Sequence, residues 1–393
     1  MKTLLKNVQV YMDNQWIENG YLLIENDVID GAGSMETCPE PDEQYITIEL
    51  SNEYKLIPGF IDLHIHGAAG ADTMDGTQEA LGTMAAALPM EGTTSFLATT
   101  MTTAQSDIER ALQNAATYIN QHGVTGKAEV LGVHLEGPFI SPKRIGAQHP
   151  DYVMMPSIDL FRKWQELAGG HIKLVTMAPE QPNGLELVRY LKEQGVVASI
   201  GHSDATYEEV VKSMEAGVNH ATHLYNQMRP IHHREPGVVG AVLLHDEIKC
   251  EIIADGIHSR PEMVRFAYNN KGQEGLILIT DAMRAKCLGE GTYDLGGQDV
   301  TVKDGQATLA DGTLAGSILT LKDAAKNVQQ YTKCGLEAVI QMASVNPAKQ
   351  LNVYDRKGSI ETGKDADLVI LDQNDEIYMT FCRGQIAYTT REG

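Results

Sequence analysis

The sequence predicts an α/β protein, a (β/α)8 TIM-like barrel with a small β-sandwich domain built from both termini. Three observations lead to this prediction. Eight apolar, strand-like runs alternate with amphipathic or alanine-rich segments in the middle of the chain, a pattern typical of a parallel sheet covered by helices. Strand-like runs separated by turn residues occupy both ends. The 393 residues are enough for one large catalytic domain and a smaller one.

The middle of the chain supplies the barrel. Its predicted strands cover residues 56–66, 94–99, 129–136, 172–179, 196–202, 220–225, 250–258 and 276–281. Predicted helices follow most of them, at residues 77–88, 104–121, 157–167, 185–194, 206–216 and 261–269. A doubly wound open sheet is the alternative, but the Gly-x-Gly-x-x-Gly fingerprint is absent after the early strands. A stretch rich in Gly, Asp and Thr, residues 292–316, predicts an inserted hairpin.

The two ends of the chain supply the small domain. Short β-like runs occur at residues 8–11, 21–24 and 45–48, and again at 367–371, 377–380 and 385–388. Because neither end alone buries a useful core, we expect both to form one β-sandwich. This assigns residues 1–56 and 358–393 to the small domain and 57–357 to the catalytic barrel.

The charge and the cysteines exclude several classes of protein. Lys and Arg number 31 against 53 Asp and Glu, a net charge of −22, which disfavours binding to nucleic acid or to an anionic membrane. The sequence contains no run of 18 apolar residues, so it predicts no membrane span, and no signal-peptide core precedes Asp13. Five scattered cysteines without a CxxC pair predict reduced thiols in a cytoplasmic enzyme.

Metal-competent side chains occur at the C-terminal ends of six of the eight predicted strands. They are His64, His66, Glu136, His202, His220, His223, Asp255, His258 and Asp281. In a βα barrel this edge carries the active site. Each residue alone has an ordinary explanation, such as packing or helix capping. Together they predict a nitrogen and oxygen ligand set suited to zinc or iron.

Five short motifs follow one another through this region: PGFIDLHIH at residues 58–66, HLEGPF at 134–139, GHSDA at 201–205, HLYNQM at 223–228 and ADGIH at 254–258. The first resembles the opening motif of the metal-dependent amidohydrolase superfamily. The other four narrow the resemblance to the N-acetylglucosamine-6-phosphate deacetylase family. They occur in the order of that family, from about residue 57 to residue 317.

The resemblance implies metal ligands. Residues that match the divalent-metal site of the family are Glu136, His202 and His223. The pair that holds a second metal in binuclear members matches His64 and His66. The resemblance therefore implies one or two divalent ions per chain, with zinc or iron expected.

The resemblance also implies catalytic and substrate-binding residues. Asp281 matches the catalytic carboxylate. Residues at the positions that contact the sugar phosphate are Ala147, Gln148, Asn226, Gln227, Arg234, His258, Leu314, Ala315 and Gly316. The family further implies a homodimer in which Arg234 serves the site of the neighbouring subunit.

The chemistry of these residue types agrees with this resemblance. A divalent metal lowers the pKa of bound water to about 7. The resulting hydroxide attacks the acetyl carbonyl, and the metal or His258 supports the oxyanion. Asp281 acts first as general base and then as general acid toward the amine. The expected reaction converts N-acetyl-D-glucosamine 6-phosphate into D-glucosamine 6-phosphate and acetate, a step of amino-sugar catabolism.

A basic segment next to the predicted ligand His223 bears on the substrate. Residues 229–234 contain two arginines and two histidines in an otherwise acidic chain. One interpretation is a solvated loop that pairs with acids such as Glu235. The other is a clamp for a phosphate dianion, for which the arginine fork is well suited.

Two other functions stay open at this point. One is a cyclic amidase of the dihydroorotase or hydantoinase kind, which usually bridges two metals with a modified lysine at a strand end. Lys173, the nearest strand lysine, is instead at the start of its predicted strand. The other is an inactive barrel that serves as a binding module, although such a protein would be expected to have lost its ligands.

Overall fold

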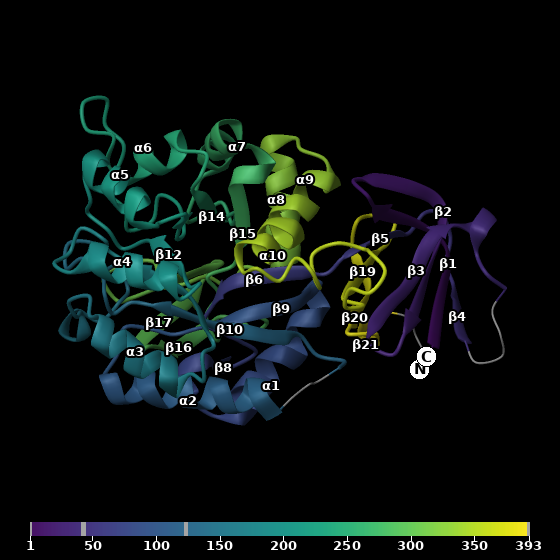
Figure 1. Ribbon diagram of the computed structural model, residues 1–393, viewed down its shortest axis with the longest axis horizontal. Helices are drawn as coiled ribbons and strands as arrows, with labels where there is room; N and C mark the ends of the chain where they lie inside the picture. The colour runs from purple at the N-terminus through teal and green to yellow at the C-terminus, as the bar shows by residue number, and fades with distance from the viewer. Residues whose placement is uncertain (1, 41–44, 122–124, 391–393) are drawn as a thin grey trace.

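The computed structural model describes residues 2–40, 45–121 and 125–390. Its largest feature is a sheet of eight parallel strands in the order β15-β14-β13-β12-β11-β10-β9-β6 (Figure 1). The strands are β6 (Phe60–Ile65), β9 (Thr93–Thr99), β10 (Glu129–Glu136), β11 (Ile172–Met177), β12 (Val197–Ile200), β13 (His220–Ala221), β14 (Lys249–Ile253) and β15 (Leu276–Ile279). A parallel bridge between Ile65 and Ala282 joins the two edges of the sheet. The predicted barrel is therefore confirmed.

Helices cover the outside of the barrel. They are α1 (Gln78–Ala87), α2 (Gln105–Gln121), α3 (Ile158–Leu167), α4 (Gly184–Glu193), α5 (Tyr207–Ala216), α6 (Gly237–Leu244), α7 (Pro261–Gly275), α8 (Leu321–Thr332), α9 (Leu336–Ile340) and α10 (Asn346–Gln350). The sequence patterns did not predict α6. Seven of its eight residues are buried, and a helix that is apolar all round has no amphipathic period to reveal it.

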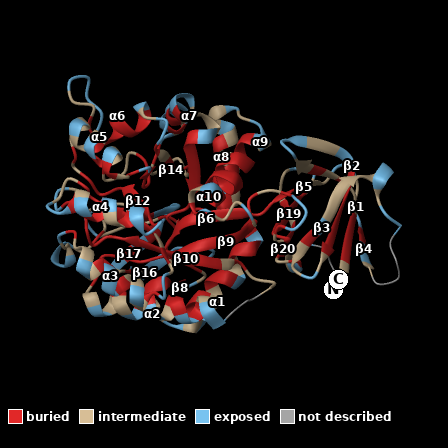
Figure 2. Ribbon diagram, viewed as in Figure 1, coloured by how far each residue is buried: buried red, intermediate tan, exposed pale blue. Residues whose placement is uncertain are grey.

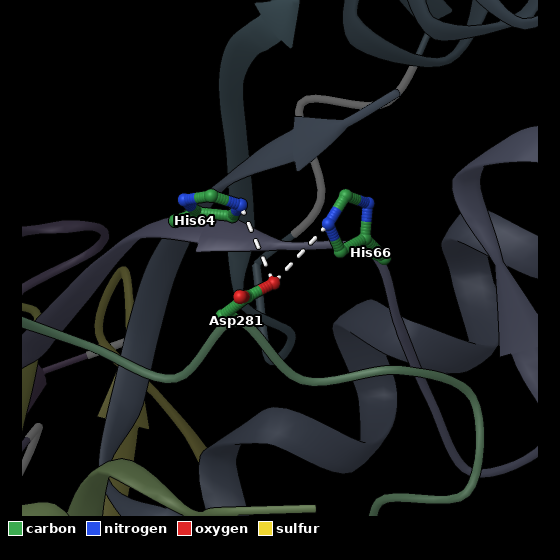
Figure 3. Close-up of side chains that lie close together, drawn as sticks. All are labelled: His64, His66 and Asp281. Carbon is green, nitrogen blue, oxygen red and sulfur yellow. Dashed lines mark ion pairs between the residues drawn. The ribbon is translucent and has the colours of Figure 1, made fainter. Parts of the chain in front are cut away.

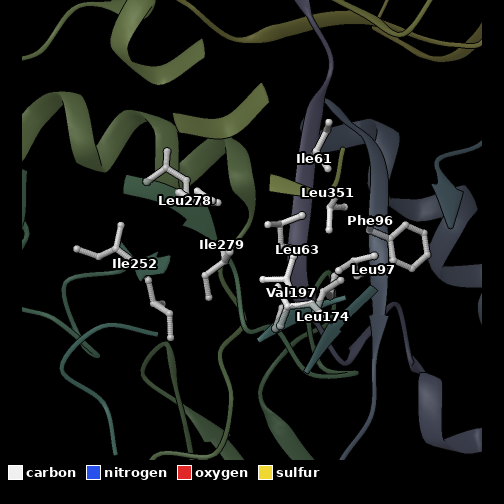
Figure 4. Close-up of a cluster of buried hydrophobic side chains, with 14 of the residues drawn as sticks. Ile61, Leu63, Phe96, Leu97, Leu174, Val197, Ile252, Leu278, Ile279 and Leu351 are labelled. Carbon is white, nitrogen blue, oxygen red and sulfur yellow. The ribbon is translucent and has the colours of Figure 1, made fainter. Parts of the chain in front are cut away.

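The barrel strands are buried in a large apolar cluster that they share with the surrounding helices. Strand side chains such as Leu63, Leu97, Leu174 and Ile279 are fully buried and pack in one cluster (Figure 4). Figure 2 shows the strands buried and the outward helix surfaces exposed. Such strands, covered on both faces, lose the alternation of a half-exposed sheet, which is why their sequences read as continuous apolar runs.

A second sheet joins the two ends of the chain. Its strand order is β21-β20-β19-β5-β1-β2-β3, and β4 pairs with β1. The strands are β1 (Lys2–Met12), β2 (Gln15–Glu25), β3 (Val28–Ser34), β4 (Tyr45–Glu49), β5 (Lys55–Pro58), β19 (Leu368–Leu371), β20 (Ile377–Cys382) and β21 (Gln385–Thr389). Many of their buried apolar side chains, from both ends of the chain, share one hydrophobic cluster. The boundary that we predict after residue 56 falls inside β5, which pairs with β1 and β19.

Two details of the sequence prediction need correction. Strand β3 was not predicted, because its sequence VIDGAGS holds two glycines and no clear alternation. The predicted hairpin is a three-stranded antiparallel sheet of β16 (Gly291–Leu295), β17 (Gln298–Lys303) and β18 (Gln306–Thr308). Across residues 2–40, 45–121 and 125–390, the helices are all too short or too polar to cross a bilayer.

A buried ion-pair network connects the barrel to the terminal sheet. Lys357 is only 2% exposed, and its Nζ lies 2.8 Å from Glu129 Oε2, 2.9 Å from Asp365 Oδ2 and in contact with Asp367. Glu129 begins barrel strand β10, whereas Asp367 directly precedes β19. These carboxylates keep the buried ammonium charged, and the pKa of Lys357 is raised in spite of its burial.

We expect Lys357→Met to destabilise the fold by about 3–5 kcal/mol, since loss of one partner leaves buried carboxylates unpaired. Thermal unfolding monitored by circular dichroism measures the effect. The matched control is Lys163→Met, because Lys163 is half-exposed in its ion pair with Glu109 and should change stability by less than about 1 kcal/mol. Equal shifts for both variants would contradict the prediction.

Candidate active site

A cavity of about 330 Å3 lies at the C-terminal ends of the barrel strands. Predicted site residues that line it are His66, Glu136, Ala147, Gln148, His202, His223, Asn226, Gln227, His258, Asp281, Leu314 and Gly316. Glu136 is the last residue of β10, and His64 lies near the end of β6. The cavity-lining members His66, His202, His223, His258 and Asp281 follow β6, β12, β13, β14 and β15. The chain thus brings together residues that are far apart in sequence, at the edge where barrel enzymes carry their sites.

Glu136, His202 and His223 place three ligand atoms at the corners of a nearly equilateral triangle. The two histidine Nε2 atoms are 3.1 Å apart, and Glu136 Oε1 lies 3.3 Å from His202 and 3.2 Å from His223. Metal–ligand bonds of about 2.0 Å in tetrahedral geometry separate the ligand atoms by about 3.3 Å. The triangle therefore has the size of one face of a zinc coordination tetrahedron.

A second group of ligand atoms adjoins the first. The Nε2 atoms of His64 and His66 lie 3.4 and 3.2 Å from Asp281 Oδ1 (Figure 3). Glu136 stands between the two groups, because its Oε1 is 3.4 Å from His64 Nε2 and its Oε2 is 3.2 Å from His66 Nε2. The two ligand groups therefore adjoin each other, and Glu136 contacts both.

The two carboxylates of the site are ionised, as cation binding requires. Burial alone would raise the pKa of Glu136, but the charge of His64 and hydrogen bonds from His202 and His223 lower it well below its ordinary value. The same balance of burial, the charge of His64 and the hydrogen bond of His66 lowers the pKa of Asp281 to about 2. Both carboxylates are therefore ionised at neutral pH. His64 Nε2 is buried without a hydrogen-bond partner, as expected of an atom reserved for a metal.

The backbone is strained where three of these side chains enter the site. His202, His223 and Asp281 have φ values of 47°, 32° and 48°, in the left-handed region that side chains other than glycine rarely adopt. Each residue follows the end of a barrel strand by two positions. Such conformations cost about 1–3 kcal/mol each and tend to cluster at functional sites.

Two further predicted residues have clear roles in the local hydrogen bonding. Gln148 Oε1 accepts a hydrogen bond from the backbone N–H of Thr102 at 2.7 Å, which turns its Nε2 toward Glu136 Oε2 at 2.8 Å. Gln148 thus orients the shared carboxylate. His258 Nδ1 donates to Asp255 Oδ2 at 2.7 Å, so its other ring nitrogen is left for the cavity that the residue lines.

Three predicted residues do not line the cavity. His64 is fully buried beneath it, and Ala315 is buried with its N–H donated to the carbonyl of Ala307. Arg234 is exposed, with Nη1 2.8 Å from His233 Nε2. Lining residues that sequence reasoning missed are Met101, Gly146, Leu295 and Thr313. Their residue types carry no chemical signal, although Gly146 and Thr313 adjoin predicted segments.

Comparison with known proteins agrees with this geometry. The chain matches the amidohydrolase family over residues 56–387. The chain belongs to the amidohydrolase family. It is 48% identical over 392 residues to an N-acetylglucosamine-6-phosphate deacetylase of Bacillus subtilis, covering 99% of this chain and 98% of that protein. The amidohydrolase family is metal-dependent, and the two ligand groups described above meet that requirement.

Solved structures of other amidohydrolases share the whole fold. An N-acetylglucosamine-6-phosphate deacetylase from Pasteurella multocida superposes with a TM-score of 0.91 at 30% identity, over 98% of this chain and 99% of that one. A mutant enzyme from Mycobacterium smegmatis, in complex with N-acetyl-D-glucosamine-6-phosphate, gives the same TM-score and identity over 99% of this chain and 100% of that one.

We expect His202→Ala to weaken zinc binding by the apo-protein more than about a hundredfold. Loss of a residue that only hydrogen-bonds a metal ligand lowers metal affinity by about 10- to 100-fold, and loss of a ligand itself should lower it further. Competition with a chromophoric chelator measures the affinity. His171→Ala is the control, because His171 is half-buried beside Asn120 on the outside of the barrel. If His202→Ala retained the wild-type affinity, the triangle of ligand atoms would not be a metal site.

Proposed function

We propose that this amidohydrolase removes the acetyl group of N-acetyl-D-glucosamine 6-phosphate, giving D-glucosamine 6-phosphate and acetate. The observation that carries the proposal is the triangle of Glu136, His202 and His223 next to the carboxylate of Asp281 in one cavity. The name of the 48%-identical relative supports the same substrate. A place in amino-sugar catabolism follows from this reaction.

The cofactor is one or two divalent ions, with zinc or iron best suited to the imidazole and carboxylate donors. Glu136, His202 and His223 would hold one ion, and His64 and His66 would hold a second. A bound ion supplies Lewis acidity, which lowers the pKa of a water molecule and polarises the amide carbonyl.

Asp281 is proposed to move the proton. It takes a proton from the attacking water, and after the tetrahedral adduct has formed it gives that proton to the nitrogen as the C–N bond breaks. The amine then leaves neutral rather than as an amide anion, and the acetyl carbon leaves as acetate. Asp281 is 8% exposed and lines the cavity, so its carboxylate reaches both water and substrate.

His258 is proposed to stabilise the carbonyl oxygen. Burial disfavours its charged form, but the hydrogen bond to Asp255 outweighs this and raises the pKa of His258. With Nδ1 fixed on Asp255, the ring offers its Nε2–H to an oxygen that becomes negative in the transition state. Asn226, Gln227 and the turn at Leu314 and Gly316 line the same cavity and are proposed to bind the sugar.

The phosphate is proposed to be bound by Arg234 of a second copy of the chain. Arg144 and Arg229 are both engaged by Asp204, at 2.7 and 2.9 Å, whereas Arg234 projects from the surface. Large apolar side chains are exposed in the same part of the chain, at Ile231, Leu244, Met263 and Phe266. Such a concentration favours contact with another subunit, and hence a homodimer.

The alternatives fit less well. A cyclic amidase would need a bridging lysine at the cavity, but Glu136 stands between the two ligand groups and Lys173 is the second residue of β11. An inactive binding module would not be expected to keep every ligand and the catalytic carboxylate in register. The cytoplasmic location remains a prediction, supported by five free cysteines.

The decisive test is acetate release from N-acetyl-D-glucosamine 6-phosphate by wild type and Asp281→Asn. We expect the variant to keep the ion held by Glu136, His202 and His223 and to lose about 10³-fold or more in kcat, because its carboxamide cannot accept the proton. Metal content, measured on the same preparation, is the control. Near-normal turnover would overturn the proton shuttle, and an inactive wild type loaded with metal would overturn the substrate.

Arg234→Ala should raise KM for the phosphorylated sugar at least about tenfold with little change in kcat, because an arginine–phosphate contact binds ground and transition states alike. Arg260→Ala is the control, since Arg260 is also an exposed arginine and pairs with Glu262. Activity on N-acetylglucosamine without phosphate should be equally low in both variants. An unchanged KM would remove Arg234 from the phosphate site.

A further inference from the structure

A carboxylate that the proposed mechanism does not use lies directly beneath the ligand groups. Glu251 belongs to β14 and is fully buried. Its Oε2 lies 3.0 Å from His64 Nδ1 and accepts a hydrogen bond from the backbone N–H of His223 at 3.1 Å. One oxygen atom therefore contacts a residue from each of the two ligand groups.

We propose that Glu251 is a positioning residue: it orients the ring of His64 so that Nε2 faces the second ion that the proposed function assigns to His64 and His66. This inference rests on the metal-dependent function proposed above and adds the residue on which the affinity for the second ion depends. Glu251 itself touches neither the cavity nor the substrate.

The hydrogen bond fixes the protonation of the His64 ring. An ionised carboxylate only accepts hydrogen bonds, so His64 Nδ1 carries the proton that points at Glu251. Nε2 is then the ring atom left for a cation, and it lies 3.4 Å from both Glu136 Oε1 and Asp281 Oδ1. A carboxylate behind a histidine in this way both orients the ring and strengthens it as a metal ligand.

The same carboxylate supports the other ligand group through the backbone. Glu251 Oε2 holds the N–H of His223, and the Glu251 carbonyl accepts from the N–H of Leu224 at 2.9 Å. These two bonds hold the strained turn in which His223 adopts a φ of 32°. Glu251 therefore connects the two groups by a rigid element and sets their separation.

The balance of buried charge favours a cation above Glu251. Glu136, Asp281 and Glu251 are three carboxylates in one buried cluster, and they form ion pairs with histidines. Burying unpaired carboxylates costs several kcal/mol each. Imidazoles that bind a metal are neutral and compensate no charge, so this excess needs at least one divalent ion to offset it.

Glu251 is not itself proposed as a ligand, although its carboxylate, His64 and His134 bring three donor atoms within 4.8 Å of one another. Both ring nitrogens of His134 are already used: Nδ1 lies 3.1 Å from the carbonyl of Leu63, and Nε2 lies 2.6 Å from Thr176 Oγ1. His134 thus belongs to the polar layer under the site, as does His220, whose Nδ1 contacts Ser199.

Titration of the chelator-treated apo-protein with Co²⁺, followed by calorimetry and by metal analysis, tests the proposal. Wild type should bind two ions per chain. Glu251→Gln should keep the tighter ion and bind the second about 10- to 100-fold more weakly. Ser199→Ala is the matched control. Ser199 is buried in the polar layer and forms hydrogen bonds with Thr222 and His220, not with His64. This variant should bind two ions as wild type does.

The proposal is overturned if wild type binds one ion only, or if Glu251→Gln binds two ions with unchanged affinities. Should Glu251→Gln fail to fold, anomalous scattering from Co²⁺-loaded crystals of wild type decides instead. An ion on His64 Nε2, with Nδ1 on Glu251, supports the proposal, and an absent ion or one on Nδ1 refutes it. These readouts do not involve acetate release, so failure of the proposed substrate would be seen separately.

Discussion

The site depends on the position of one buried carboxylate. Oε1 of Glu136 lies within 3.4 Å of His64, His202 and His223, and Oε2 faces His66 and Gln148. A charged group in so dry a place is stable only if it is compensated. The surrounding imidazoles, their supporting hydrogen bonds and the turns that present them all follow from the need to hold this carboxylate and the ions it would share.

The barrel reconciles this polar cluster with a stable core by separating them in depth. Apolar side chains of the strands and helices pack in one large cluster, and a polar layer of Thr176, Thr222 and Ser199 hydroxyls, hydrogen-bonded to one another at 2.5–2.6 Å, lies just beneath the histidines. Hydrogen bonds within that layer offset the cost of burying it. The ligands are therefore supported from below by a rigid network rather than by mobile loops.

The fold and the metal-competent residues could be predicted from local patterns in the sequence, whereas the roles of ligands and substrate-binding residues came from the family resemblance. Apolar runs ending in His, Glu or Asp show where strands end, and a parallel barrel gathers all such ends at one edge. Glu251 was not predicted because its position reads as the interior of an apolar strand, and only the three-dimensional contact with His64 gives it a role. Met101 and Leu295 were not predicted for the same reason. They line the cavity through tertiary packing, and the sequence does not distinguish an apolar side chain in a core from one in a binding site.

The separation of chemistry and stability along each strand explains why one chain can hold strained residues at its active site. Left-handed conformations at His202, His223 and Asp281 cost energy, but they occur after the strands have ended, where the regular ladder no longer needs those residues. The backbone bonds from Asp281 N–H to the His64 carbonyl and from His66 N–H to the Ala282 carbonyl, at 2.8 and 2.9 Å, then join the first strand to the segment after the last. Closure of the barrel and alignment of His64, His66 and Asp281 are therefore one structural event, and a chain that fails to close has no second ligand group.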